Sequence, residues 1–127
     1  NMYKRQQLDI HLTHVSAKCL HLYLRGNETR HTRVTLDFIH KRMLINRNQS
    51  DEGHSHGERS CPLLLEGKTL QLRVFSDSSS IEIFTDGGRT CMSSTIYPIH
   101  SSQDIWMKTE GGTVEIARLQ LWNMQKK

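Results

Sequence analysis

Apolar and polar residues alternate along most of this chain with a period of two. The alternation is clearest between residues 70 and 98, where two short alternating segments precede a glycine-containing turn and a third segment. A period of two is typical of β-strands that bury one face. The same pattern recurs in four earlier segments, at residues 8–12, 20–24, 34–38 and 43–45.

Residues 70–98 are predicted to form a β-meander. Between the alternating segments 70–74 and 81–84 lies a serine-rich run whose side chains hydrogen-bond to their own backbone and so favour a turn. The Asp-Gly-Gly-Arg string at 86–89 tolerates the positive φ angles of a tight hairpin. Residues 92–97 are the expected return strand, and Pro98 ends it because proline cannot donate to a strand ladder.

The remaining segments point to the same architecture. Residues 46–60 are polar, charged and contain glycine, so we expect an exposed loop there. Two further strands, joined near residues 110–112, are expected to direct six apolar residues inward, namely Ile105, Met107, Val114, Ile116, Leu119 and Leu121. Two facing sheets bury many one-sided strands at once. We therefore predict that residues 1–127 form a single all-β domain, a two-sheet antiparallel β-sandwich of the jelly-roll or concanavalin-like type.

Charge and hydropathy exclude two classes of partner. Residues 1–47 carry nine Lys or Arg against three acidic residues, but these charges alternate over several strands and no aromatic residues are interleaved with them. No apolar run approaches the roughly 20 residues that a membrane span requires. We therefore expect no nucleic-acid partner and no membrane partner.

The cysteines and histidines predict no metal and no cofactor. Cys19, Cys61 and Cys91 are odd in number and widely spaced, which favours buried free thiols in a reducing compartment. A bacterial cytoplasmic protein is expected on this ground, with secretion as the alternative. The pair His54 and His56 lies near Cys61, but a structural zinc site usually takes a second pair of ligands, which the sequence lacks.

No pair of residues has the pattern of a catalytic centre. Asp77 and Glu82 are two carboxylates of the kind that glycoside hydrolysis uses. However, Asp77 belongs to the serine-rich turn, where capping is the ordinary role of aspartate, and Glu82 alternates with inward isoleucines. Ser93 and Ser94 lie within a predicted strand and have no nucleophile-elbow pattern.

The meander nevertheless carries a family resemblance. A Phe-x-Asp-x-Ser-Ser-Ile-Glu-Ile-Phe string is followed by Asp-Gly and by Ser-x-Ile-Tyr-Pro, and this combination resembles the C-terminal β-sandwich domain of glycoside hydrolase family 32. That family contains invertases, sucrose-6-phosphate hydrolases, levanases and inulinases. The matching residues are Phe75, Asp77, Ser79, Ser80, Ile81, Glu82, Ile83, Phe84, Asp86, Gly87, Ser94, Ile96, Tyr97 and Pro98. Ser78 departs from the pattern, since the family commonly has a basic residue there.

The resemblance implies an accessory domain without catalytic residues. Catalytic members carry their two aspartates in Asp-Pro strings and their acid glutamate before a cysteine. The only prolines here, Pro62 and Pro98, follow Cys61 and Tyr97, and no Glu-Cys dipeptide exists. The resemblance thus implies a module of a sucrose or fructan hydrolase that packs on and stabilises the catalytic β-propeller of the same parent chain, and in some members forms a homodimer.

One aromatic residue leaves an alternative function open. Trp106 stands between the inward Ile105 and Met107, so it is the expected exposed aromatic residue and a candidate for an interdomain or a sugar contact. Phe84 and Tyr97 are expected in the sandwich core rather than at an interface. The alternative function is a lectin-like module that binds fructan or another carbohydrate.

We predict that this chain alone does not hydrolyse sucrose. Without the two-carboxylate machinery, the release of glucose and fructose, measured by a coupled colour assay, should equal that of buffer. Hydrolysis that coelutes with the purified chain would contradict the accessory role.

Overall fold

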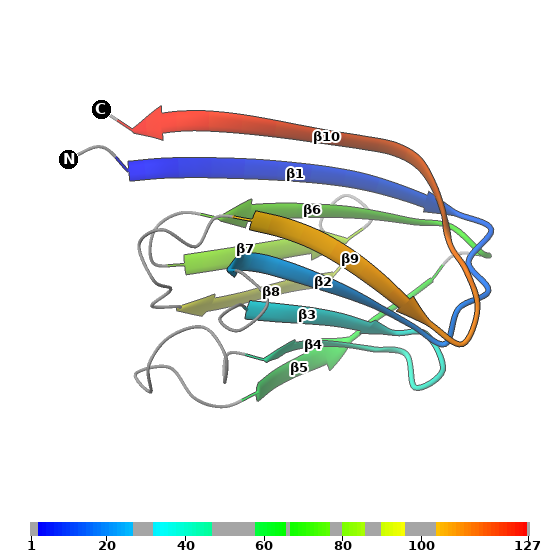
Figure 1. Ribbon diagram of the computed structural model, residues 1–127. Helices are drawn as coiled ribbons and strands as arrows, with labels where there is room; N and C mark the ends of the chain where they lie inside the picture. Colours follow the sequence, from blue (N-terminus) through cyan, green and yellow to red (C-terminus); the bar gives the residue numbers. More distant parts are fainter. Residues whose placement is uncertain are drawn as a thin grey trace.

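The computed structural model describes residues 3–26, 32–46, 58–65, 67–76, 80–85, 90–95 and 104–126. These residues form ten β-strands in two antiparallel sheets (Figure 1). The strands are β1 (Tyr3–Thr13), β2 (Cys19–Gly26), β3 (Thr32–Asp37), β4 (Arg42–Asn46), β5 (Glu58–Pro62), β6 (Leu70–Ser76), β7 (Ser80–Thr85), β8 (Thr90–Thr95), β9 (Asp104–Glu110) and β10 (Glu115–Lys126). Within the described part of the chain, no helix is long and apolar enough to cross a membrane.

The two sheets pack face to face, so the predicted all-β sandwich is confirmed. The first sheet has the order β10-β1-β6-β7-β8 and the second has the order β5-β4-β3-β2-β9. Neighbouring strands in both sheets pair antiparallel, and β5 contacts β8 where the two sheets meet at one edge.

The core consists of the inward-facing residues that the alternation predicts. In β6 the burial of successive residues alternates strictly from Leu70 to Val74. In β7, Ile81 and Ile83 are 0% exposed while Glu82 between them is exposed. The fully buried residues of the other strands obey the same rule, among them Ile10, Leu12, Leu20, Leu22, Leu24, Leu36, Met43 and Ile45. A chain of one-sided strands thus gains its stability by burying those faces against each other.

The structure corrects the predicted loop at 46–60, because residues 58–60 belong to strand β5. This strand pairs with β4 along its whole length, from Arg42↔Pro62 to Asn46↔Glu58. It lies at the edge of the second sheet, where Cys61 packs against the core, and its sequence Glu-Arg-Ser-Cys-Pro has no apolar alternation to predict a strand. Strand β8 also begins earlier than expected, at Thr90 rather than Met92.

Cys19 and Cys61 are partly exposed, although the sequence predicts buried thiols. Cys19 precedes the inward Leu20, so it faces away from the core. Cys61 points inward from an edge strand, which is covered on one side only. The side chain of Cys91 lies outside the described part of the structure.

Two neighbouring crossovers join the sheets at one end of the sandwich. Residues 14–18 connect β1 to β2, and residues 111–114 connect β9 to β10. Backbone hydrogen bonds bind the crossovers together, with the N–H groups of Ser16 and Ala17 both donating to the Thr113 carbonyl, at 2.9 and 3.0 Å. The crossovers therefore fix the spacing of the two sheets.

A β-bulge explains the odd spacing of apolar residues in β10. His11 pairs with Arg118 and Leu12 pairs with Ile116, so Ala117 has no partner in the β1–β10 register. The extra residue restores the alternation, and Ile116, Leu119 and Leu121 all lie opposite the inward residues of β1.

We predict that Gly112→Ala destabilises the protein by about 3 kcal/mol. Gly112 has a φ angle of +144°, and a Cβ atom there would lie 2.5 Å from the Ser16 carbonyl oxygen on the other crossover. Gly67→Ala is the matched control, because Gly67 also has a positive φ angle, +63°, but a Cβ atom at Gly67 would have open space around it. Urea unfolding should show a loss of only about 1 kcal/mol for the control. Equal losses for the two variants would contradict the close approach.

Candidate functional site

The predicted site residues between Phe75 and Pro98 fall into two groups, those that the structure describes and those that it does not. Phe75, Ile81, Glu82 and Phe84 lie on the adjacent strands β6 and β7, and the backbone of Ser80 begins β7. The other predicted site residues lie outside the described residues, namely Asp77, Ser79, Asp86, Gly87, Ile96, Tyr97 and Pro98. The structural role assigned to the string stays a prediction.

Phe84 is not a core residue, contrary to the expectation. Its backbone pairs with Arg73, and both side chains lie on the outer face of the first sheet. The reason is the strand period: because Ile81 and Ile83 face inward, Phe84 faces outward together with Glu82. Its ring meets the ring of Phe75 edge to face, with centroids 5.9 Å apart and planes at 82°.

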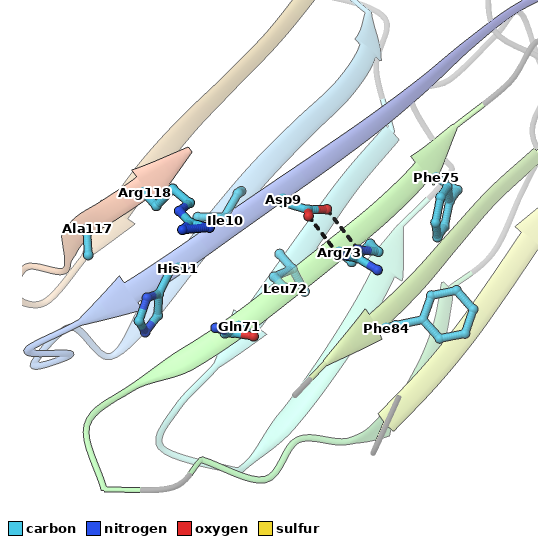
Figure 2. A pocket seen from close by; sticks show the side chains of 10 residues that line it. All are labelled: Asp9, Ile10, His11, Gln71, Leu72, Arg73, Phe75, Phe84, Ala117 and Arg118. Carbon is cyan, nitrogen blue, oxygen red and sulfur yellow. Dashed lines mark hydrogen bonds and ion pairs between the residues drawn. The ribbon is translucent and has the colours of Figure 1, made fainter. Parts of the chain in front are cut away.

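These rings border a hollow on the outer face of the first sheet, which we name the outer hollow. Its volume is about 830 Å³, and it crosses β10, β1, β6 and β7 (Figure 2). Its outward side chains are Asp9, His11, Gln71, Arg73, Phe75, Phe84 and Arg118. Figure 2 shows the two phenylalanines at one end, Asp9 and Arg73 in the middle, and His11 and Arg118 toward the other end.

An ion pair with two hydrogen bonds occupies the middle of the outer hollow. Arg73 donates from Nε to Asp9 Oδ1 and from Nη2 to Asp9 Oδ2, both at 2.9 Å. The hydrogen bonds from Arg73 lower the pKa of the Asp9 carboxyl below its ordinary value, and the positive charge of Arg118 acts in the same direction. Asp9 and Arg73 are 64 residues apart, and the register Asp9↔Arg73 between β1 and β6 places them opposite each other.

Trp106 lies on the outer face of the second sheet. It pairs with Tyr23, and the two rings are stacked with centroids 5.1 Å apart and planes at 13°. Beside them, His21 is hydrogen-bonded to Thr35 and to Glu110, at 2.8 and 2.7 Å. The hydrogen bond with His21 lowers the pKa of the Glu110 carboxyl. Trp106 faces outward as expected but is half-buried by this stack, and its role as an interdomain or sugar contact stays a prediction.

The inward side of β10 forms a third surface, which we name the β10 row. It consists of Ile116, Leu119 and Leu121, whose exposed fractions are 43, 45 and 44%. Their partners on β1 are fully enclosed, since Leu8, Ile10 and Leu12 are at most 3% exposed. The apolar inner face of the first sheet therefore continues onto its edge strand without a full cover. The sequence identified these residues as inward but could not show that they are half exposed.

No cluster of three or more His, Cys, Asp or Glu side chains that could hold a metal ion occurs among the described residues. His54 and His56 lie outside those residues, so the structure does not test them.

Sequence and fold comparisons identify the family. Residues 3–123 match the family described as "Glycosyl hydrolases family 32 C terminal", and the chain therefore belongs to this family. It is 38% identical over 64 residues to a levanase from Bacillus sp. (strain L7), which covers 50% of this chain and 7% of the levanase. It is 33% identical over 92 residues to the sucrose-6-phosphate hydrolase of Escherichia coli, which covers 72% of this chain and 19% of that enzyme.

A solved structure shows the same fold. The exo-inulinase of Aspergillus awamori superposes with a TM-score of 0.81 and 22% identity, covering 97% of this chain and 25% of the inulinase. The chain thus spans a quarter or less of the length of these relatives.

We predict that the ion pair in the outer hollow makes stability depend on pH. Because the pKa of Asp9 is lower in the folded than in the unfolded chain, the unfolded chain binds more protons at mildly acidic pH. The stabilisation is therefore present above the ordinary pKa of 3.8 and is lost as the pH falls through the folded value. In urea titrations, wild type should exceed Asp9→Asn in stability at pH 6, and the difference should vanish as Asp9 becomes protonated. Parallel pH profiles for the two proteins would contradict this assignment.

Proposed function

We propose that this chain is the C-terminal accessory domain of a larger β-fructosidase, a hydrolase of sucrose or fructans, and packs against its catalytic domain. Membership of the family supports a β-fructosidase as the parent protein. The chain matches only 19 to 25% of the length of two relatives, which supports a parent that is larger than this chain. The chain contributes no Asp-Pro or Glu-Cys string, so hydrolysis belongs to the catalytic domain. By packing on that domain, this one stabilises it.

The observation that carries the proposal is the β10 row. Three large aliphatic side chains on neighbouring inward positions of an edge strand are each more than 40% exposed. Covering one of them removes about half of its apolar surface from water, which contributes about 1 kcal/mol per side chain. A contiguous apolar surface of this kind marks an interaction site more often than scattered apolar residues do.

The position of the start of β1 favours the catalytic domain as the partner that covers the β10 row. Tyr3 at the start of β1 pairs with Lys126 at the end of β10, and both strands lie at one edge of the sandwich (Figure 1). Polypeptide that precedes β1 therefore joins the domain beside β10. A second copy of this chain is the competing occupant, and it would make the row a homodimer interface.

We predict that Leu119→Ser together with Leu121→Ser weakens the parent enzyme more than the isolated chain. The parent enzyme of this proposal is a chain in which the domain is joined to a catalytic domain that carries Asp-Pro strings and a Glu-Cys dipeptide. Thermal inactivation of the double variant should occur several degrees lower, because the docking contact is lost in addition to the packing within the domain. Ile39→Ser is the control, since Ile39 is 61% exposed and lies outside the row.

A hydrophobic dye provides a second measurement. The isolated chain should increase the fluorescence of the dye, the double variant should do so less, and the parent enzyme should do so least. Equal dye binding by the chain and the parent would contradict docking through the row. Concentration-dependent dimers of the isolated chain that the double variant abolishes would instead identify a second copy as the occupant.

A further inference from the structure

We propose that the outer hollow binds a short neutral oligosaccharide of fructose, at a site separate from the docking surface. The assignment to fructose rests on the proposed function, whereas the assignment to an oligosaccharide rests on the size and lining of the hollow. The outer hollow and the β10 row lie on opposite faces of the first sheet, so both can be occupied at once.

The dimensions of the outer hollow suit several linked sugar rings. It crosses four neighbouring strands, and at ordinary strand spacing the distance from β10 to β7 is roughly 14 Å. Its volume of about 830 Å³ lies within the range of small-ligand sites. A single monosaccharide would leave most of this space empty, so an elongated ligand fits better.

The lining combines apolar and polar groups as a carbohydrate requires. Sugar rings present C–H groups on their faces and hydroxyl groups at their edges. Phe75 and Phe84 offer half-buried aromatic surface at one end, in a position where neither ring contributes to the inner core. The aromatic rings can contact the C–H faces of a sugar, and the charged side chains beside them can bind its hydroxyl groups.

The Asp9–Arg73 pair provides an oriented set of acceptors and donors. Its two parallel hydrogen bonds hold the carboxylate and the guanidinium in one plane. The carboxylate oxygens keep lone pairs for further hydrogen bonds, and the guanidinium keeps further N–H donors. Neighbouring hydroxyl groups of a sugar can therefore both donate and accept here. Because the pair is already fixed, little side-chain entropy is lost on binding.

Charge favours a neutral ligand over a phosphorylated one. Asp9 and Arg73 neutralise each other in the middle of the hollow, and Arg118 lies at its β10 end. A phosphate group placed at the middle would meet the Asp9 carboxylate. One cation at the margin does not form the paired donors that a phosphate site usually has.

The test is a titration of the folded 127-residue chain with short levan-type and inulin-type oligosaccharides, in which binding is measured by calorimetry or protein NMR. Sucrose 6-phosphate and a cellulose-derived oligosaccharide of equal length are the comparison ligands. We expect saturable binding of at least one fructan. Phe84→Ala and Arg73→Lys should each weaken that binding about tenfold, because one removes the aromatic surface and the other removes the planar fork.

Three controls keep the result interpretable. Trp106→Ala tests the other candidate sugar contact, on the outer face of the other sheet, and should leave binding unchanged if the outer hollow is the site. Phe84→Tyr keeps the ring and should restore binding, which separates a ligand contact from a folding defect. The double variant of Leu119 and Leu121 should bind normally, so failure of docking and failure of sugar binding are distinguishable.

Several outcomes would overturn the proposal. They are no saturable binding of any fructan, loss of binding in Trp106→Ala but not in Phe84→Ala, equal binding of the cellulose fragment, and tighter binding of sucrose 6-phosphate. Binding that Phe84→Ala and Arg73→Lys weaken selectively would support the outer hollow as the site.

Discussion

The structure depends on one constraint, which is that each strand has a single apolar face and must find another such face to cover it. Two five-stranded sheets satisfy this requirement along most of their length, and the paired crossovers near Gly112 keep them at the right separation. The edge strand β10 satisfies it incompletely, because its inward residues are only about half covered. The same constraint that forms the core therefore also produces the surface through which the domain is proposed to act.

Most of the fold follows from local alternation, and its exceptions have specific causes. Strands β6 and β7 are visible in the sequence because every second residue is buried, from Leu70 to Val74 in β6 and at Ile81 and Ile83 in β7. Strand β5 is not visible, since an edge strand is defined by hydrogen bonds to its neighbour rather than by its side chains. The bulge at Ala117 was equally hidden, because one extra residue is interpretable only when the partner strand is known.

Less of the candidate site could be predicted, because its residues meet only in three dimensions. Asp9 and Arg73 appear in the sequence as ordinary outward residues, and only the β1–β6 register joins them. For Phe84 two sequence signals disagree. The strand period places its side chain outward, whereas the general preference of aromatic residues for the core places it inward. The period was the stronger guide, since strand geometry fixes the direction of a side chain whatever its hydropathy.

The place of β1 between β6 and β10 has a consequence for biosynthesis. The first strand of the domain pairs with the last, so its register with β10 joins Leu8 to Leu121 across nearly the whole chain. A ribosome must release almost the entire domain before β1 acquires both neighbours, and contacts of such long sequence separation form slowly. Until then β1 is an open edge, exposed to pairing with other nascent chains. Premature termination before β10 would make that exposure permanent, so the most C-terminal strand also protects the most N-terminal one.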